Sequence, residues 1–410
     1  MLSQSYFSFI TIILKLAGAW EPAYDSRWRN VLLDVYNVVC LTFTLVFFYG
    51  SEVAFTIASR DNISLLLQCI TWLATHTAAV FKTLLWLFNR RQILKVIRSL
   101  DASEFQYEAT DSFDPSEVMK MKNKYNYIYL SLHFWAGQMI PVTNCLGAIA
   151  SLYLEQTNHD MTVANTSVCD NLPFPTYIPW ITDTKLRCLF TIIAQGIGVG
   201  TFGFMIISMD GMFTSSVSFI TAHFLVLQGA FRSLLPRAML NMKNHNGNGH
   251  DLDGQINVEM NKCVKHLQTL LSAVDNIENM YKFQTLTMAL VTLFVVCNNL
   301  FIISTMPITS KAFLGHLSYL LTCEVEFSAY CWFGNELTLA CAHLTQALYE
   351  SDWIQFNAKV KRSILLTMTR MDRPVTLSMG KFSPLTLNTL VSTLRGSYSF
   401  FAVLKQMNDS

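Results

Sequence analysis

Seven stretches of the chain are apolar over roughly 20 residues each, the length that a helix needs to cross the hydrocarbon core of a membrane. This feature excludes an ordinary water-soluble fold. Inside a bilayer every backbone polar group must be hydrogen-bonded within the protein, which a helix achieves by itself. The sequence therefore predicts an all-α, polytopic membrane protein with seven transmembrane helices. The stretches are Val31–Ala58, Leu65–Phe88, Tyr127–Leu154, Leu186–Met209, Thr285–Met306, Ala312–Gly334 and Pro384–Leu404.

The composition agrees with a membrane protein. The 410 residues are 52% hydrophobic and 14% charged, whereas about 25% of the residues of an ordinary soluble protein are charged. The 29 Lys and Arg residues nearly balance the 28 Asp and Glu residues, so no bulk charge points to a polyanionic partner. These proportions exclude a disordered chain, a secreted disulfide scaffold and a basic protein that binds nucleic acid.

The sequence contains no recognisable motif for catalysis or for binding a metal or cofactor. The ten cysteines form no Cys-x-x-Cys pair, and most lie in apolar stretches, where a free cysteine behaves as a small hydrophobic residue. No P-loop, His-Glu-x-x-His or Gly-x-Ser-x-Gly motif occurs. We therefore predict no enzyme activity, no metal site and no cofactor.

The distribution of charge along the chain predicts its orientation. The N-terminal segment and the loops after the second, fourth and sixth apolar stretches are rich in Lys and Arg, whereas the alternate loops carry few. By the positive-inside rule, the N-terminus is then cytoplasmic and the C-terminus extracellular. Asn-x-Ser/Thr patterns at Asn62, Asn165 and Asn408 all fall on the side predicted to be external. We predict glycosylation at Asn62 and Asn165.

Helical periodicity continues beyond the fourth and fifth apolar stretches on the cytoplasmic side. Apolar residues recur at spacings of three and four from Phe213 to Leu234 and from Val264 to Tyr281. These faces predict cytoplasmic helix extensions that form an anchor bundle, and the pattern leaves open whether they also meet neighbouring subunits. A further short helix, over the apolar residues Phe7 to Leu14, is expected to lie against the inner face of the membrane.

The last apolar stretch carries small and polar residues along one helical stripe. Thr386, Thr389, Thr393 and Gly396 recur at helical spacing, and Arg395 lies near the middle of the stretch. Small residues allow close packing against other helices, whereas polar residues also suit a helix that borders a water-filled pore. The periodicity alone does not decide between these two interpretations.

Four sequence blocks in the C-terminal part carry a family resemblance. They are YCWFGNEL at Tyr330–Leu337, ALYESDW at Ala347–Trp353, RPVTLSMGKF at Arg373–Phe382 and SYSFFAVLKQ at Ser397–Gln406. The blocks closely resemble the C-terminal half of insect odorant receptors, and KLAGAWEP at Lys15–Pro22 is similar to the leading motif of that family. The chain is less similar to the co-receptor that the family shares, because the link between its fourth and fifth stretches is short.

The resemblance implies an odorant-gated, non-selective cation channel. The chain would be the ligand-tuning subunit of a heterotetramer with the co-receptor, embedded in the lipid of the plasma membrane of olfactory neuron dendrites. Its last helix would line the pore for permeant cations, with the constriction at Phe401, Leu404 and Lys405. The expected ligand is a small volatile, mostly apolar molecule in the outer half of the membrane. The matching pocket residues are Trp72, Leu73, His76, Met139, Thr143, Ile192, Ile193, Tyr319 and Thr322.

Hydropathy and resemblance together divide the chain into five regions. Residues 1–210 would hold the first four transmembrane helices and the pocket, and residues 211–284 the cytoplasmic extensions of helices four and five. Residues 285–334 would form helices five and six, residues 335–382 further anchor helices, and residues 383–410 the pore-lining helix with a short external C-terminus.

Other classes of membrane protein fit the sequence less well. A G-protein-coupled receptor has its N-terminus outside, opposite to the charge distribution here, and the last stretch contains no Asn-Pro-x-x-Tyr motif. A transporter would show internal repeats or paired broken helices. The related gustatory receptors are the nearest alternative, but their last helix tends to end in a Thr-Tyr…Gln-Phe pattern, where this chain reads Ser397-Tyr398 to Gln406-Met407.

Overall fold

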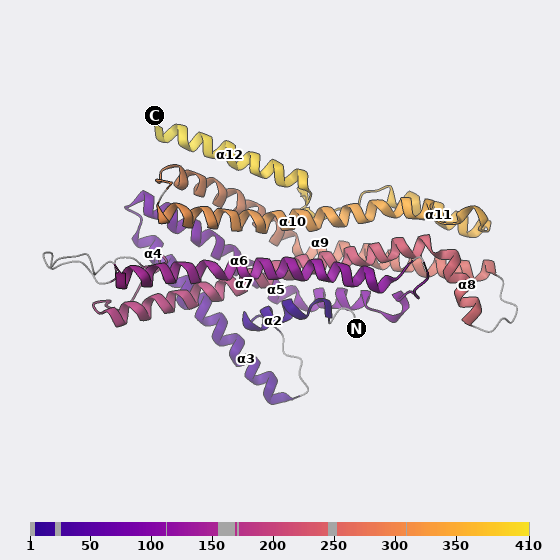
Figure 1. Ribbon diagram of the computed structural model, residues 1–410, viewed down its shortest axis with the longest axis horizontal. Helices are drawn as coiled ribbons and strands as arrows, with labels where there is room; N and C mark the ends of the chain where they lie inside the picture. Colours follow the sequence, from indigo (N-terminus) through magenta and orange to yellow (C-terminus); the bar gives the residue numbers. More distant parts are fainter. Residues whose placement is uncertain are drawn as a thin grey trace.

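The computed structural model describes residues 5–20, 26–111, 113–154, 169, 172–244, 252–308 and 310–409. Most of these residues belong to long helices that lie side by side in a bundle (Figure 1). The N-terminal half contains α2 Ser8–Leu16, α3 Arg27–Thr42, the π-helical η1 Phe43–Phe48, α4 Tyr49–Ala58, α5 Ile63–Leu100, the 3-10 turn η2 Ser103–Phe105 and α6 Pro115–Leu154. The C-terminal half contains α7 Lys185–Arg232, α8 Leu234–Asn244, α9 Leu252–Ser304, α10 Lys311–Tyr349, η4 Trp353–Gln355, α11 Ala358–Met371, β1 Ser378–Met379, β2 Ser383–Pro384 and α12 Leu387–Asp409. The all-α prediction is confirmed.

Four helices begin at a polar residue that the sequence places just before an apolar run. The side-chain oxygens of Asn62, Thr184, Ser310 and Asn357 accept hydrogen bonds from backbone N–H groups three residues further on, at the starts of α5, α7, α10 and α11. Such N-caps satisfy donors that a helix leaves unpaired at its first turn. Asn62, a predicted glycosylation site, is therefore also the cap of α5.

Each predicted apolar stretch lies mainly within one of the helices, the first of them across α3, η1 and α4. By length and composition alone, three helices of the described residues could cross a membrane, namely Arg27–Ala58, Lys185–Arg232 and Leu252–Ser304. The other stretches carry polar side chains that lower their mean hydropathy. The Lys82 side chain of α5, for example, is buried and pairs with Asp210 of α7. Polar residues of this kind face the interior of a bundle rather than lipid.

The long helices continue without a break beyond the predicted membrane spans. α7 has 48 residues and α9 has 53, as the apolar periodicity predicted. α5 and α6 extend in the same way, to Leu100 and from Pro115 respectively, which hydropathy did not indicate. The predicted region boundaries after residues 210, 284 and 334 therefore fall inside continuous helices, and one hydrophobic core cluster runs across all three.

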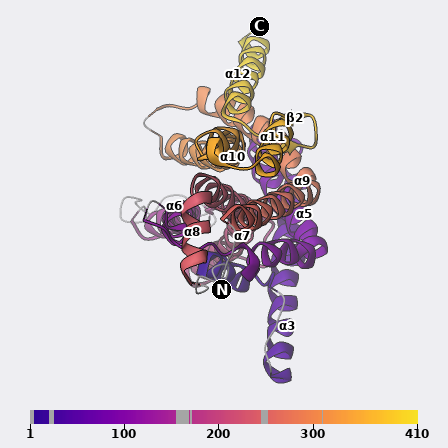
Figure 2. The same cartoon turned by 90° about the vertical axis from the view of Figure 1, so that its right-hand side faces the viewer.

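α7 is the central helix of the fold. It packs against α2, α5, α6, α9 and α10, and nearly every residue from Ile207 to Phe231 is buried. In the end-on view of Figure 2, α7 lies inside the bundle, whereas α3 and α12 project from opposite sides. The projecting helices keep many large apolar side chains exposed, including Val38 and Phe47 on the first span and Tyr398 and Val403 on α12. Exposed apolar surface of this extent requires lipid or protein to cover it.

The predicted N-terminal helix exists, but its partner differs from the prediction. Ile10, Ile13 and Leu14 of α2 are fully buried in the core of the protein, and the Tyr6 hydroxyl is hydrogen-bonded to Ser218 Oγ of α7 at 2.6 Å. The buried apolar face of α2 packs against α7 and α6, while Ile12 and Leu16 remain exposed. The sequence of α2 gave no indication of which surface its apolar face would cover.

A short hairpin sets the start of α12. β1 and β2 pair antiparallel, with Ser378 opposite Pro384, and Gly380 and Lys381 between them have φ values of +56° and +67°. The Gly380 N–H donates to Lys282 O at 3.1 Å, and a Cβ at this glycine would lie 2.9 Å from the Leu286 side chain. Position 380 therefore requires glycine, because it combines left-handed backbone with close contact to α9.

Two buried histidines lie in the part of the bundle outside the predicted membrane spans. His223 of α7 and His266 of α9 have ring centroids 5.4 Å apart, and neither ring nitrogen of His223 has a hydrogen-bond partner among the described residues. Burial lowers the pKa of His223 to about 4 and also lowers the pKa of His266. Both rings are therefore neutral at physiological pH.

We expect this protein to lose stability in acid because of His223. Its pKa is about 6.5 in an unfolded chain and about 4 in the fold, so the unfolded chain binds more protons between these pH values. The free energy of unfolding then falls as the pH is lowered from 6.5 to 4, by up to about 3 kcal/mol. Melting temperatures of detergent-solubilised wild type and His223→Phe, measured across this range, test the prediction. Equal acid sensitivity of the two proteins would contradict it.

Candidate ligand-binding site

A small cavity of about 60 Å³ lies between α5, α6, α7 and α10. Aromatic and aliphatic side chains form most of its wall, and a few polar groups converge on it, which is the usual composition of a small-molecule site. The lining residues are Trp72, Thr75, His76, His133, Gly137, Ile140, Pro141, Val199, Gly203, Ile206, Ile207, Tyr319, Thr322, Cys323 and Glu326.

Four residues of the predicted pocket, Trp72, His76, Tyr319 and Thr322, line this cavity. The rings of Trp72 and Tyr319 are stacked with their centroids 4.5 Å apart, and the Tyr319 hydroxyl is hydrogen-bonded to Thr75 Oγ1. Trp72 and His76 are four residues apart on α5, and Tyr319 and Thr322 are three apart on α10, so each pair shares one helix face. The two faces meet at the cavity.

The side chain of His76 is fixed in place by a buried carboxylate. Its Nδ1 lies 2.7 and 2.8 Å from the two carboxylate oxygens of Glu52 on α4, and its ring stacks on Phe202 of α7 at 4.2 Å. The side chains of His76 and Glu52 are 3% and 4% exposed. His76 thus presents a fixed polar group to the cavity, and Glu52 is a supporting residue that the sequence did not single out.

The other predicted pocket residues lie outside this cavity. Leu73 borders a separate hollow beside Thr287 and Val291 of α9, because it is one residue, or about 100°, around α5 from Trp72. Met139 and Ile193 are 49% exposed, and Thr143 is exposed on the same face of α6 as Met139. Ile192 is buried in another apolar cluster. These residues lie on helices that line the cavity, but the rotation of each helix turns their side chains away from it.

Next to the cavity lies a buried charge cluster formed by Lys82, Asp210 and Glu326. The sequence analysis assigned no role to these three residues. The Lys82 ammonium donates to Asp210 Oδ1 at 2.8 Å and to Glu326 Oε1 at 3.0 Å. The Tyr330 hydroxyl also donates to Asp210 Oδ1, and Gln284 Nε2 donates to the Tyr330 hydroxyl at 2.8 Å. The cluster joins α5, α7 and α10, Gln284 links it to α9 through Tyr330, and Glu326 reaches the cavity wall.

The size of the cavity bears on how a ligand could enter it. An apolar cavity of about 150 Å³ holds one benzene molecule, whereas this cavity measures about 60 Å³. A volatile molecule larger than benzene therefore fits only after the walls move apart.

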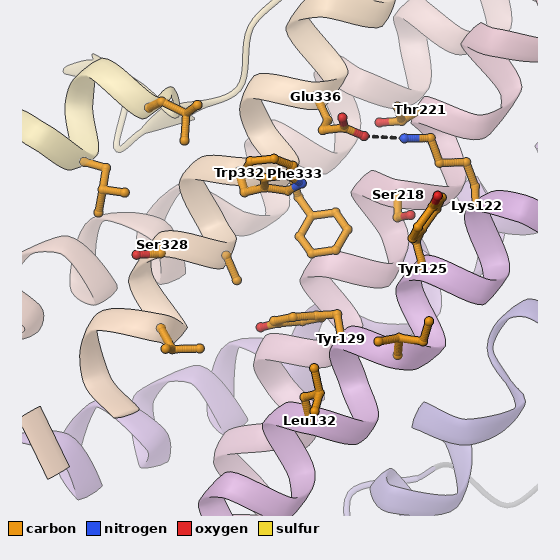
Figure 3. Close-up of a pocket in the computed structure, with 15 residues that line it drawn as sticks. Lys122, Tyr125, Tyr129, Leu132, Ser218, Thr221, Ser328, Trp332, Phe333 and Glu336 are labelled. Atoms are coloured by element: carbon orange, nitrogen blue, oxygen red, sulfur yellow. Dashed lines mark hydrogen bonds and ion pairs between the residues drawn. The ribbon is translucent and has the colours of Figure 1, made fainter. Parts of the chain in front are cut away.

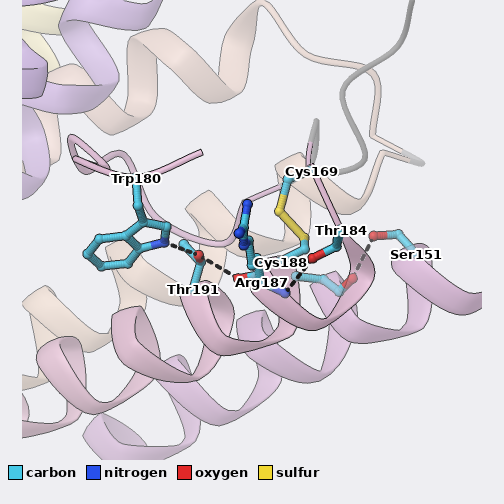
Figure 4. Close-up of a disulfide and its surroundings, with 8 residues drawn as sticks. Ser151, Cys169, Trp180, Thr184, Arg187, Cys188 and Thr191 are labelled. Carbon is cyan, nitrogen blue, oxygen red and sulfur yellow. Dashed lines mark hydrogen bonds between the residues drawn. A yellow bond between two sulfur atoms is a disulfide. The ribbon is translucent and has the colours of Figure 1, made fainter. Parts of the chain in front are cut away.

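A disulfide fixes a segment that packs against one wall residue of the cavity, Trp72 (Figure 4 shows the disulfide). Cys169 is bonded to Cys188 near the start of α7, with their Cα atoms 5.7 Å apart. In the segment that follows Cys169, the Phe174 ring packs edge-on against Trp72 at 5.9 Å. Gln195 of α7 also holds this segment, donating to Phe174 O at 3.0 Å. Cys169 lies in a polar part of the sequence, and the sequence gives no sign of its partner.

The predicted pore residues lie on α12, away from the cavity. Phe401 is partly buried and its ring centroid lies 6.0 Å from that of Tyr398, Lys405 is exposed, and the side chain of Leu404 lies outside the described part of the chain. In the stripe of small residues, Thr389 is buried, and a Cβ at Gly396 would lie 3.9 Å from Leu293 of α9. The stripe thus packs partly against α9, while the rest of α12 remains exposed.

The Asn side chains of one of the two predicted glycosylation sites, and of one further Asn-x-Ser pattern, are not described by the structure. Asn165 lies outside the described residues, and so does the side chain of Asn408. Among the residues that the structure describes, no group of three His, Cys, Asp or Glu side chains is arranged to hold a metal ion.

The fold and the cavity together define a class of protein: a helical membrane receptor with a small, aromatic-lined site buried among its helices. Comparison with known families identifies the class more closely. A family model described as 7tm Odorant receptor matches residues 62–398. The chain belongs to this odorant receptor family.

One curated relative matches the full length of the chain, and another matches about half of it. It is 21% identical over 422 aligned positions to Odorant receptor 46a, isoform B, of Drosophila melanogaster, with 100% of both chains covered. It is 24% identical over 196 positions to Odorant receptor Or2 of Anopheles gambiae, covering 48% of this chain and 51% of that one.

A solved structure has the same fold. The insect olfactory receptor OR5 from Machilis hrabei superposes with a TM-score of 0.76 at 16% identity, covering 99% of this chain and 98% of that one. The same receptor in complex with eugenol gives a TM-score of 0.74 at 16% identity, with 98% of each chain covered. The family and the fold confirm the predicted membrane protein with seven transmembrane helices. The relatives are sensory receptors, in agreement with the prediction that this chain is not an enzyme.

Proposed function

We propose that this chain is the ligand-tuning subunit of an odorant-gated, non-selective cation channel. It binds a small volatile molecule in the cavity between α5, α6, α7 and α10 and assembles with the family's co-receptor as a heterotetramer. The observation that carries the proposal is the convergence of Trp72, His76 and Tyr319 on one cavity in a chain of this family. The related receptor solved with eugenol supports a volatile ligand.

The walls of the cavity favour a mostly apolar ligand with one polar group. Stacked Trp72 and Tyr319 supply aromatic area, and burial of apolar area contributes about 25 cal/mol per Å². His76, Thr322 and Glu326 supply hydrogen-bonding groups that orient the ligand. Volatile esters, alcohols and terpenes combine these properties.

The disulfide supports the predicted orientation. Disulfides persist in oxidising compartments outside the cell, and Cys169–Cys188 lies at the end of the bundle that precedes α7. This end is the one predicted to be external from loop charge. The N-terminus is then cytoplasmic and the C-terminus extracellular, in the plasma membrane of the olfactory neuron dendrite.

Helix α10 provides a direct route from the cavity to the pore helix. Tyr319 and Thr322 lie on its cavity face, and further along the same helix a Cβ at Gly334 would lie 2.7 Å from the Leu385 side chain, just before α12. A ligand that opens the channel must bind the open state more tightly than the closed state. In our mechanism the ligand enlarges the cavity, moves α10 against α12, and dilates the constriction at Phe401, Leu404 and Lys405.

The substitution Tyr319→Ala tests recognition in the cavity. We expect the concentration for half-maximal response to rise about tenfold for ligands that contact the ring, because about 50 Å² of apolar contact is lost, and to change little for ligands that do not. Dose–response curves for several ligands measure the effect, and Tyr319→Phe, which keeps the ring, is the control. An equal shift for every ligand would assign Tyr319 to gating instead.

The substitution Lys405→Gln tests the placement of the pore. A positive charge beside a cation pathway opposes permeation, so its removal should raise single-channel conductance and alter cation selectivity. Unchanged conductance, selectivity and block would instead place Lys405 at the outer membrane interface, where a lysine extends its ammonium toward water.

The proposed function as a whole is tested by whole-cell voltage clamp. Cells expressing this chain, with and without the co-receptor, receive a panel of volatile esters, alcohols and terpenes. We expect a rapid cation current that requires the co-receptor and persists when G-protein signalling is blocked. A current abolished by the block would overturn the channel mechanism.

A further inference from the structure

A second and larger cavity lies apart from the candidate ligand site. It is a groove of about 580 Å³ between α6, α7, α10 and the start of α12. Tyr129 and Phe333 form its apolar floor, while Tyr125 and Trp332 at its edges are 61% and 55% exposed. Nothing in the proposed function uses this groove (Figure 3).

One end of the groove is charged and the other is apolar. Lys122 of α6 and Glu336 of α10 form an ion pair at the charged end, with their side chains 15% and 36% exposed. Figure 3 shows this pair at one end, with Thr221 beside it, and Leu132 at the opposite end. The groove therefore matches an amphiphilic molecule, which also has one charged end and one apolar end.

The depth of the groove matches one leaflet of a bilayer. Lys122, Glu336 and Leu387 each lie close to the cytoplasmic boundary of the apolar stretch in their own helix, although the three stretches are far apart in sequence. From Lys122 to Leu132 the helix rises about 15 Å, which is half of the roughly 30 Å hydrocarbon core. In the predicted spans and the orientation proposed above, the ion pair is then at the depth of the cytoplasmic headgroups and Leu132 is near the bilayer centre.

We propose that this groove binds one phospholipid of the cytoplasmic leaflet, with a zwitterionic headgroup that carries a primary ammonium. The Lys122 ammonium pairs with the lipid phosphate, and the Glu336 carboxylate accepts hydrogen bonds from the ethanolamine ammonium. An acyl chain lies along Tyr129, Phe333 and Leu132. The protein's own cation and anion are thus each matched by the opposite charge of the headgroup. A phosphatidylcholine headgroup has no N–H donor to add to the bond that the Lys122 ammonium already gives Glu336.

The experiment is native mass spectrometry of the detergent-solubilised full-length chain with equimolar phosphatidylethanolamine, phosphatidylcholine and phosphatidylglycerol that have identical acyl chains. We expect wild type to retain phosphatidylethanolamine about tenfold better than phosphatidylcholine, the scale of a lost charge-assisted hydrogen bond. Glu336→Gln should abolish this preference, and Lys122→Gln should weaken retention of all three lipids. Lys124→Gln is the matched control, because Lys124 is exposed on the same helix and does not line the groove.

A further variant guards against misfolding of the charge variants. Ala329→Trp fills the groove without a change of charge and should displace the lipid while the size-exclusion profile remains that of wild type. If none of these variants altered lipid retention, the proposal would be overturned. A preference for phosphatidylglycerol would overturn the assignment of an ethanolamine headgroup. The measurement uses neither odorant nor co-receptor, so its result is independent of the proposed channel function.

Discussion

Replacing Lys82 by methionine is expected to lower the free energy of unfolding by about 3–5 kcal/mol, the usual cost of removing one partner from a buried ion pair. The Lys82 side chain is 3% exposed and bonds both Asp210 and Glu326. Without its ammonium, two carboxylates remain buried near each other with no cation to balance them. Thermal unfolding in detergent, followed by loss of the monodisperse size-exclusion peak, measures the effect.

Two further variants make the Lys82 result specific. Arg187→Gln removes the partner of Asp183 in an ion pair whose side chains are more than half exposed, and it should cost less than about 1 kcal/mol. The triple variant Lys82→Met, Asp210→Asn, Glu326→Gln removes all three charges and should recover most of the lost stability. If Lys82→Met had the melting temperature of wild type, the Lys82 ammonium would not be needed to balance the two buried carboxylates.

Replacing Arg237 by methionine should have a similar cost, again about 3–5 kcal/mol, at the other end of the bundle. The buried Arg237 guanidinium of α8 pairs with Glu259 of α9, donates to Ala230 O at 2.7 Å, and lies over the Tyr107 ring at 4.7 Å. After the substitution, the one side-chain hydrogen bond left to Glu259 among the described residues comes from Asn241 Nδ2, at 2.9 Å. We expect a lower melting temperature and faster proteolysis near the ends of α8 and α9.

The matched control is Lys265→Gln, which breaks an exposed pair with Glu104. Its effect should stay below about 1 kcal/mol. If Arg237→Met and Lys265→Gln were equally mild, burial would not determine the strength of ion pairs in this part of the protein.

The transmembrane helices could be predicted from the sequence because their signal is local. A run of apolar residues of sufficient length requires a helix in a membrane wherever it lies in the fold. The extension of α5 beyond its span was missed, although Ile93, Ile97 and Leu100 recur at helical spacing and are all buried. The helical periodicity was therefore present in the sequence. The basic residues between these positions lowered the local mean hydropathy, so the hydropathy did not reveal it.

The candidate site could be predicted only in part, because it depends on how helices rotate against each other. Trp72 and Leu73 are adjacent in sequence, yet only Trp72 reaches the cavity. The Lys82, Asp210 and Glu326 side chains come from three helices, and no sequence spacing links them. Cys169 and Cys188 are 19 positions apart, and with ten cysteines in the chain composition could not pair them.

The unbroken length of α7 has a mechanical consequence. Its 48 residues form a rod of about 70 Å, with Ile206 and Ile207 on the cavity wall and Ala230 buried in the core far beyond it. If the cavity end were held fixed, a tilt of only 2° would displace the far half of such a rod by about 1 Å. α7 is thus a lever arm, because a displacement on the scale of a single methyl group at the cavity becomes a shift of the size of an atomic contact at the far end of the helix.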